Sequence, residues 1–354
     1  MKDIPFIFNH DSSGSHLIGR ADESAELEAN ALSGRHTALV SCRGAGKTAL
    51  LASLCADLAS DEVKPVSIDM FMIRSVSEFC RRLAEAVLGN EAQEYLASAG
   101  ESEAGFAASV LQLPELIAQG QGFRYVICLD EFQQISIFRE GNALLKHMRR
   151  ICGGQQSVTW IIAGDDTPFM RGLFRGRSAV FARLFSVLAL PDIQASAWRD
   201  EIRRRYEASG KYISSELAER IVDVSGGNAA YVMRLAGLVW MRANVVVSEQ
   251  DVDDAFLDLL CLEEPRFRRN VMNLTFYQMN FLRALCYGVH EGFTRRDVMA
   301  RFGLSSSANV SIIVKALLKS GLIRTDGRRT LIADAVFERW LCAEFLRAGF
   351  GHQS

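Results

Sequence analysis

The nine residues from Val40 to Thr48 constrain the fold of this chain more than any other stretch. They lie between a short apolar run and the Ala- and Leu-rich segment Ala49–Leu58. The apolar run predicts a buried strand, and the second segment predicts a helix. A strand, a glycine-rich turn and a helix N-terminus form a phosphate-binding loop, because uncapped backbone N–H groups and the helix dipole both favour an anion.

The residue types in this turn predict a nucleotide site. In the pattern G-x-x-x-x-G-K-[ST] the lysine contacts the β- and γ-phosphates and the hydroxyl binds Mg²⁺; here these residues are Lys47 and Thr48. Ser41 replaces the first glycine of the pattern. The alternative is a turn that needs glycine only for its backbone geometry. The predicted cofactors are ATP and Mg²⁺, and the predicted nucleotide-binding residues of the loop are Arg43, Gly44, Ala45, Gly46, Lys47, Thr48 and Ala49.

A second apolar run, from Tyr125 to Leu129, ends in Asp130 and Glu131. This pattern is typical of a buried parallel strand that brings carboxylates to the carboxyl edge of a sheet. In phosphate-loop NTPases the first acid holds Mg²⁺, and a following glutamate polarises the attacking water. We therefore predict that Asp130 binds magnesium together with Thr48 and that Glu131 is the catalytic base. The alternative is an acidic strand end that faces solvent.

Three further segments, 65–71, 158–164 and 185–190, predict the other strands of a five-stranded parallel sheet. Asp165 follows the second of them, where a polar side chain would lie beside the γ-phosphate. Arg183 belongs to a basic run before the last strand and is predicted as an arginine finger, in cis or in a neighbouring subunit. The alternative for this run is a solvated surface. The predicted catalytic residues are Glu131, Asp130, Lys47, Arg183 and Asp165.

The chain changes character after residue 192. Helical patterns follow, one of them opening with the capping box Ser248 and Asp251. A polar, basic stretch comes next, and then short helices and a hairpin with an Asp-Gly turn, which predict a winged helix-turn-helix. The predicted domains are an ATPase core 1–192, a helical lid 193–262, a linker 263–273 and a winged-helix domain 274–354.

The predicted winged helix carries cations that suit the phosphates of double-stranded DNA. The formal net charge of −2 gives no global bias towards nucleic acid, so DNA contact would depend on this local set. Winged helices also dock proteins, and a protein partner, autoinhibition or a homo-oligomer is therefore the alternative. The candidate DNA-binding residues are Arg295, Arg296, Lys315, Arg324, Arg328 and Arg329.

Composition bounds the class of protein. A chain of 354 residues with 49% hydrophobic and 23% charged residues is typical of a soluble globular protein. The eight cysteines form no C-x-x-C pair, which predicts reduced thiols. No apolar run approaches the roughly 18–20 residues of a membrane span, and Met1–His16 lacks signal-peptide features. We expect a cytoplasmic protein without membrane contact.

The order of the motifs resembles that of a known family. The matching segments are Leu17–Arg20, Arg43–Thr48, Leu129–Phe132, Ser225–Asn228 and Asp334–Leu341. They are similar to those of prokaryotic AAA+/STAND-type ATPases with a C-terminal winged helix, often called archaeal-type ATPases, which are distant relatives of the origin-recognition ATPases.

The resemblance implies an α/β P-loop NTPase fold of the ASCE/AAA+ type. In this fold a five-stranded parallel sheet has helices on both faces and is followed by the helical lid and the winged helix. It also implies that Ile18 and Gly19 lie against the adenine and that the protein is an ATP-driven switch with hydrolysis. Two alternatives remain: a DNA-binding regulator with a purely structural nucleotide pocket, and a protein-docking module with little hydrolysis.

Overall fold

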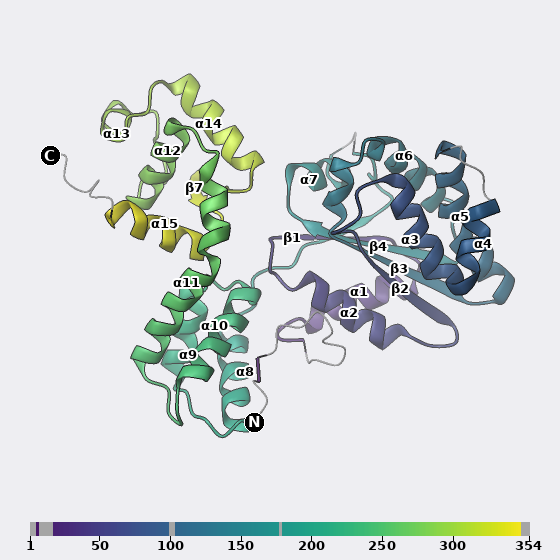
Figure 1. The fold of residues 1–354 in the computed structure, drawn as a ribbon, viewed down its shortest axis with the longest axis horizontal. Helices are drawn as coiled ribbons and strands as arrows, with labels where there is room; N and C mark the ends of the chain where they lie inside the picture. The colour runs from purple at the N-terminus through teal and green to yellow at the C-terminus, as the bar shows by residue number, and fades with distance from the viewer. Residues whose placement is uncertain (1–4, 7–16, 99–102, 177–178, 348–354) are drawn as a thin grey trace. The chain divides into compact units, whose positions relative to one another are not determined.

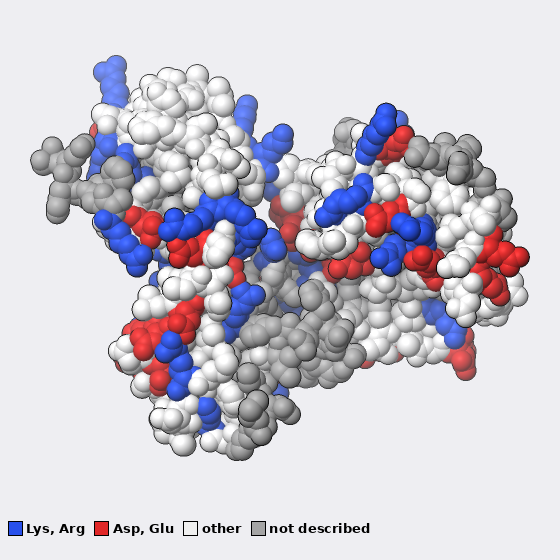
Figure 2. Space-filling model, viewed as in Figure 1, with Lys and Arg blue, Asp and Glu red and all other residues white. Residues whose placement is uncertain are grey.

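The chain folds into two compact units (Figure 1). The structure is a computed structural model that describes residues 5–6, 17–98, 103–176 and 179–347. One unit comprises Asn9–Ile193, and the other combines Met1–Phe8 with Gln194–Ser354. In the described ranges no helix is long and apolar enough to cross a membrane. On the face shown in Figure 2, basic and acidic side chains are interspersed over both units.

The first unit is built on a parallel sheet in the order β2-β3-β4-β1-β5. All residues of β1 are buried, and so are all residues of β3 after its first. Strands that are covered on both faces require continuous apolar runs, which is why these segments were recognisable. The predicted five-stranded parallel sheet is therefore confirmed. The strands are β1 (Thr37–Ser41), β2 (Val63–Asp69), β3 (Arg124–Asp130), β4 (Val158–Asp165) and β5 (Ser186–Leu188).

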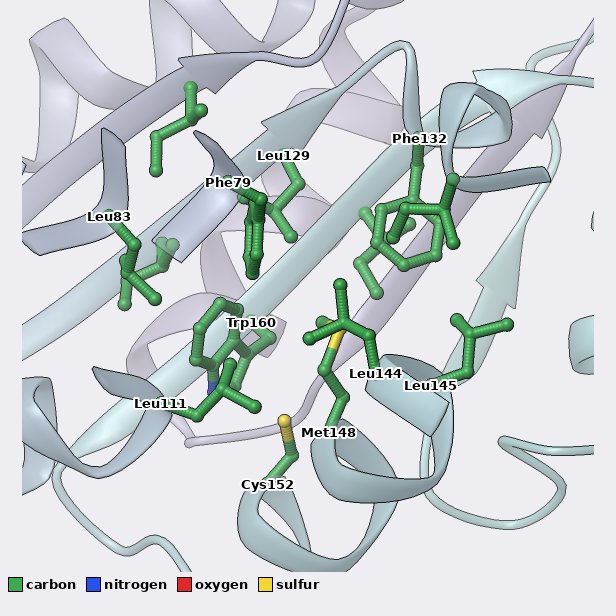
Figure 3. Close-up of a cluster of buried hydrophobic side chains, with 14 of the residues drawn as sticks. Phe79, Leu83, Leu111, Leu129, Phe132, Leu144, Leu145, Met148, Cys152 and Trp160 are labelled. Atoms are coloured by element: carbon green, nitrogen blue, oxygen red, sulfur yellow. The ribbon is translucent and has the colours of Figure 1, made fainter. Parts of the chain in front are cut away.

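Helices cover both faces of this sheet. On one face lie α1 and α2, and on the other lie α3, α5 and α6 (Figure 1). Figure 3 shows the second core, where Phe79 of α3, Leu111 of α5 and Met148 of α6 surround Trp160 of β4. The helical elements of this unit are α1 (Ala21–Leu32), α2 (Lys47–Leu58), α3 (Val76–Leu88), η1 (Gly89–Glu91), α4 (Ala92–Ser98), α5 (Glu103–Gln121), η2 (Phe132–Ile137), α6 (Gly141–Cys152) and α7 (Pro168–Phe174).

The alternation of side chains along β3 and β4 determines which face of the sheet carries Asp130 and Asp165. Along β3, Val126 and Cys128 belong to the core under α1 and α2, whereas Ile127 and Leu129 belong to the opposite core. Because side chains alternate with a period of two, Asp130 continues the α1/α2 side. The same alternation in β4 applies to Asp165, which follows Ala163 of that core. Both carboxylates therefore lie on the side where α2 begins.

In its described residues, the second unit consists of helices, one hairpin and an isolated bridge between Tyr212 and Val246. Its helices α12, α13 and α14 precede the antiparallel pair β6–β7, which is the element order that the sequence predicted for this region. The predicted capping box of Ser248 and Asp251 is present at the start of α11. The elements are α8 (Ala195–Ala208), α9 (Ser215–Val224), α10 (Ala229–Arg242), α11 (Glu249–Met272), α12 (Phe276–Cys286), α13 (Arg296–Phe302), α14 (Ser307–Lys319), β6 (Ile323–Asp326), β7 (Arg329–Ile332) and α15 (Ala335–Arg347).

The predicted linker 263–273 is helical as far as Met272, because α11 continues into it. Two of the basic residues of this segment form ion pairs along the helix: Arg266 contacts Glu263 at 2.7 Å, and Arg268 contacts Glu264 at 2.6 Å. On the other side, Phe267 is fully buried and packs against aromatic rings of α15. The elements from α8 to α10 and those from α12 to α15 are thus joined by one continuous helix, α11.

The turn before α10 contains two glycines that differ in their surroundings. Gly226 and Gly227 both have positive φ, 62° and 69°. A Cβ on Gly226 would lie 2.4 Å from the Cβ of Ala335, whereas one on Gly227 would meet nothing within 4 Å. The turn therefore approaches the start of α15 closely at one glycine only.

Replacing each glycine by alanine separates the free-energy cost of backbone strain from the cost of a steric clash. Gly226→Ala and Gly227→Ala should share a strain cost of roughly 1–2 kcal/mol. Gly226→Ala should lose a further 1–3 kcal/mol, approximately, because its methyl group overpacks the contact with Ala335. Urea unfolding of both variants measures the difference in the free energy of unfolding. Equal losses would show that Ala335 yields without cost.

Candidate nucleotide-binding site

The phosphate loop ends in a helix N-terminus that is open to a ligand. Gly46 is the N-cap of α2 with φ 94°, and a Cβ there would meet nothing within 4 Å. Glycine is therefore required by the backbone conformation and not by space. Within the described residues no side chain caps this helix end. Its first N–H groups are available to an anion, as the sequence predicted for a phosphate loop.

Lys47, the first residue of α2, is held over the loop by three acceptors. Its ammonium group donates to the carbonyls of Ser41 and Cys42 at 3.3 and 2.9 Å and to the Asp165 carboxylate at 2.8 Å. The Lys47 side chain is only 5% exposed. A phosphate that binds here would contact the same ammonium group as Asp165 does, because both are anionic oxygen acceptors.

Thr48 and Asp130 are brought together although 82 residues separate them. The Thr48 hydroxyl donates to the Asp130 carboxylate at 2.5 Å, and the other oxygen of that carboxylate accepts from the N–H of Glu131 at 2.8 Å. Hydroxyl and carboxylate oxygens are ligands that suit Mg²⁺, so these two residues fit the predicted metal. In the described part of the chain no group of three or more His, Cys, Asp or Glu side chains could hold a metal alone. The ion would therefore depend on phosphate and water oxygens as well.

Glu131 lies at the end of β3 in a left-handed conformation, with φ 55°. Burial raises the pKa of its half-buried carboxyl, as do the nearby carboxylates of Asp165 and Asp130, against an opposing effect of Lys47 and Arg43. A carboxylate with a raised pKa is a stronger general base towards water. Its environment is thus suited to the predicted role.

Two residues at the site were not predicted from the sequence. Gln133 donates to the Glu131 carboxylate at 2.6 Å and also accepts from the backbone of Asp165. Arg20, which is 4% exposed, donates to the loop carbonyl of Ala45 at 3.1 Å. The only sequence signal for Arg20 was its place in the segment Leu17–Arg20, which matches the family motif. No sequence signal indicated Gln133.

The contact between Arg20 and Ala45 also shows where the segment with the predicted adenine-binding residues lies. It joins the turn before α1 to the phosphate loop, so Ile18 and Gly19 lie in a segment anchored to that loop. The partly buried Ile18 offers an apolar side chain, and Gly19 is exposed. Contact of these two residues with adenine stays a prediction.

Arg183 lies at the amino ends of the parallel strands, whereas the phosphate loop lies at their carboxyl ends. Strand β5 runs parallel to β1 with Ser186 beside Thr37, so residues that precede β5 lie at the amino edge. The loop instead leaves the carboxyl end of β1. Arg183 is exposed there, and the prediction that it acts in cis on its own loop is wrong on geometric grounds. A role in a neighbouring subunit stays a prediction.

The candidate DNA-binding residues are all exposed, but neighbouring acids offset part of their charge. Arg295 forms an ion pair with Asp297 at 2.7 Å. In the hairpin, Asp326 is the register partner of Arg329. The hairpin turn therefore consists of Gly327 and Arg328 and not of Asp-Gly as predicted. Gly327 has φ 58°, which suits the first central position of a two-residue turn.

Comparison with known proteins supports the fold. No family model matches the chain, and no curated protein matches it. A Walker-type ATPase of Pyrococcus abyssi superposes with a TM-score of 0.73 at 16% identity, over 95% of this chain and 99% of that one. The fold is that of the P-loop ATPases. The ORC2 protein of Aeropyrum pernix, solved with ADPNP and ADP, gives 0.67 at 15% identity over 98% of both chains. The ORC1 protein of that organism, solved with DNA, gives 0.56 at 19% identity over 96% of both.

Proposed function

We propose that the protein binds ATP with Mg²⁺ and hydrolyses it. The hydrogen bond between Thr48 and Asp130 carries the proposal, because it unites two distant motifs at an uncapped helix N-terminus. The N–H groups of α2 and the ammonium group of Lys47 would hold the phosphates, and Thr48 and Asp130 would hold the metal. Ile18 and Gly19 would contact the adenine. The similarity in fold to a protein solved with ADPNP and ADP supports this assignment.

The chemistry assigned to this chain is the orientation of water and the acceptance of its proton. Glu131 takes the proton from the attacking water, and burial in a site with two other carboxylates favours that transfer. Lys47 neutralises charge on the phosphates. Mg²⁺, when bound, supplies further neutralisation of the phosphate oxygens.

Binding and turnover are measured separately to test this function. Titration calorimetry of the purified protein with ATP and MgCl₂ should give saturable binding, and phosphate release should be Mg²⁺-dependent. Binding without release, with or without DNA present, would contradict the hydrolase and leave a nucleotide-regulated binding protein. An absence of both would contradict the assignment of the site.

We further propose that ATP switches a C-terminal domain that contacts double-stranded DNA. The exposed cations of α13, α14 and the hairpin support DNA contact, and so does the similarity in fold to an ORC1 protein solved with DNA. Docking of a protein is the second candidate. It is favoured by Ile312 on α14, which is 65% exposed, and by the ion pair with Asp297 that offsets the charge of Arg295.

Charge reversal in the hairpin separates these two candidates. Arg328→Glu with Arg329→Glu should weaken binding to duplex DNA and reduce the slope of log affinity against log salt by about two, because two phosphate contacts are lost. Fluorescence anisotropy with a labelled duplex over a salt series measures the slope. Reversal of exposed Arg139 in the first unit is the control and should change neither quantity. Wild-type affinity no better than about 10⁻⁴ M at physiological salt would favour protein docking.

A further inference from the structure

The side-chain amide of Gln133 joins two parts of the candidate site. Its nitrogen donates to the Glu131 carboxylate at 2.6 Å, and its oxygen accepts from the backbone N–H of Asp165 at 3.2 Å. The opposite amide orientation would set the oxygen against a carboxylate and the nitrogen against an N–H donor. The two partners therefore determine how the amide is oriented.

The fold leaves space for this side chain at Gly164. A Cβ on Gly164 would lie 2.6 Å from the amide oxygen of Gln133 and 2.7 Å from the terminal methyl of Met170. Gly164 is absent from the residues with positive φ, so its backbone does not demand glycine. The requirement is the close approach of the Gln133 side chain to β4.

The backbone of Glu131 indicates that its position is imposed by its surroundings. A non-glycine residue in the left-handed region is strained and persists where neighbouring groups over-determine its conformation. The restraints on Glu131 are its own N–H on Asp130 at 2.8 Å, its carbonyl accepting from Gln134 at 3.0 Å, and its carboxylate on Gln133. Of these, only the bond from Gln133 acts on the carboxylate.

We propose that Gln133 is a positioning residue that fixes the Glu131 carboxylate relative to the end of β4. Because Asp165 contacts Lys47 at 2.8 Å, the amide completes a chain of contacts from the base to the lysine of the phosphate loop. The direction of the Glu131 carboxylate is thereby tied to the place where phosphate binds. This inference rests on the proposed ATPase function.

Two substitutions of Gln133 test its hydrogen bond to Glu131 separately from its hydrogen bond to the Asp165 N–H. Gln133→Leu removes both hydrogen bonds at similar volume. Gln133→Glu keeps an oxygen acceptor for the Asp165 N–H but sets a carboxylate against Glu131. We expect both variants to lower kcat by about 100-fold, the scale of a small misplacement of a reacting group. Affinity for ATP with Mg²⁺ should stay within about threefold of wild type, since the loop and helix α2 bind the phosphates.

Hydrogen exchange without nucleotide tests the same contacts independently of activity. The Asp165 amide should exchange about tenfold faster in Gln133→Leu, as expected when opening is favoured by the loss of roughly one hydrogen bond. In Gln133→Glu its exchange should match wild type. Melting temperatures establish that both variants fold, and Gly164→Ala, which displaces the amide oxygen, should reproduce the loss of kcat.

The outcomes are distinguishable. Wild-type kcat in Gln133→Glu, or unchanged Asp165 exchange in Gln133→Leu, would overturn the positioning role while the ATPase stands. No turnover in the wild type would overturn the proposed function and with it the catalytic importance of Gln133. Lower kcat in both variants with faster Asp165 exchange in Gln133→Leu alone supports the proposal.

Discussion

Lys47→Ala is expected to abolish the rise in melting temperature that ATP with Mg²⁺ gives the wild-type protein. A ligand at about 100 times its dissociation constant adds about 2.7 kcal/mol of stability. For a unit of the size of Asn9–Ile193 this corresponds to roughly 5–10 °C. The Lys47 side chain is only 5% exposed, so the variant removes a poorly screened cation from the phosphates. Scanning calorimetry with and without nucleotide measures the shift.

The variant also removes the cation that Asp165 contacts, so its melting temperature without nucleotide should fall. The decisive quantity is therefore the nucleotide-induced shift within each protein and not the melting temperature itself. Lys146→Ala, at an exposed position of α6, is the matched control and should keep the full shift. Equal shifts in Lys47→Ala and the wild type would exclude Lys47 from the nucleotide site.

The sheet and the centre of the site were predictable because both depend on local patterns. Strands β3 and β4 are buried on both faces, so their sequences are continuous apolar runs. Parallel strands place their carboxyl ends at one edge, and so the acids that follow them were expected near the loop. The Thr48–Asp130 contact bears out that expectation.

The arginine finger shows where local pattern was insufficient. Arg183 was chosen for its charge and its nearness to a strand, but it precedes β5, whereas the phosphate loop and Asp130 lie at carboxyl ends of their strands. Because β5 pairs in parallel with β1, Arg183 lies at the amino ends of these strands, away from the phosphate loop. The direction of the strand, and not the residue type, decides which edge a flanking residue reaches.

Sequence reasoning also missed or misread residues that have distant partners. The backbone partner of Gln133 is 32 residues away, so no local spacing indicates it. Arg266 was assigned to a polar, basic linker, yet it contacts Glu263 within α11 and Asp334 just before α15, the latter at 3.0 Å. Charge alone does not distinguish a solvated stretch from a helix whose ion pairs are satisfied by folding.

Glu131→Gln is expected to separate nucleotide binding from hydrolysis. The amide keeps the size of the side chain, and its oxygen can still accept from Gln133. It cannot take a proton from water, so the rate of hydrolysis should fall by about 10²–10⁴-fold. The nucleotide-induced rise in melting temperature should persist. Single-turnover measurements of phosphate formation isolate the chemical step from product release.

Glu140→Gln is the matched control for that variant, because it makes the same change at an exposed residue of the same unit and should leave the rate unaltered. Wild-type rates in Glu131→Gln would mean that another group accepts the proton, and Asp165, whose charge acts on Glu131, would be the carboxylate to test next. Retained binding together with lost turnover excludes two explanations that neither result excludes alone. A purely structural nucleotide pocket would have no turnover to lose, and a disrupted site would lose the binding as well.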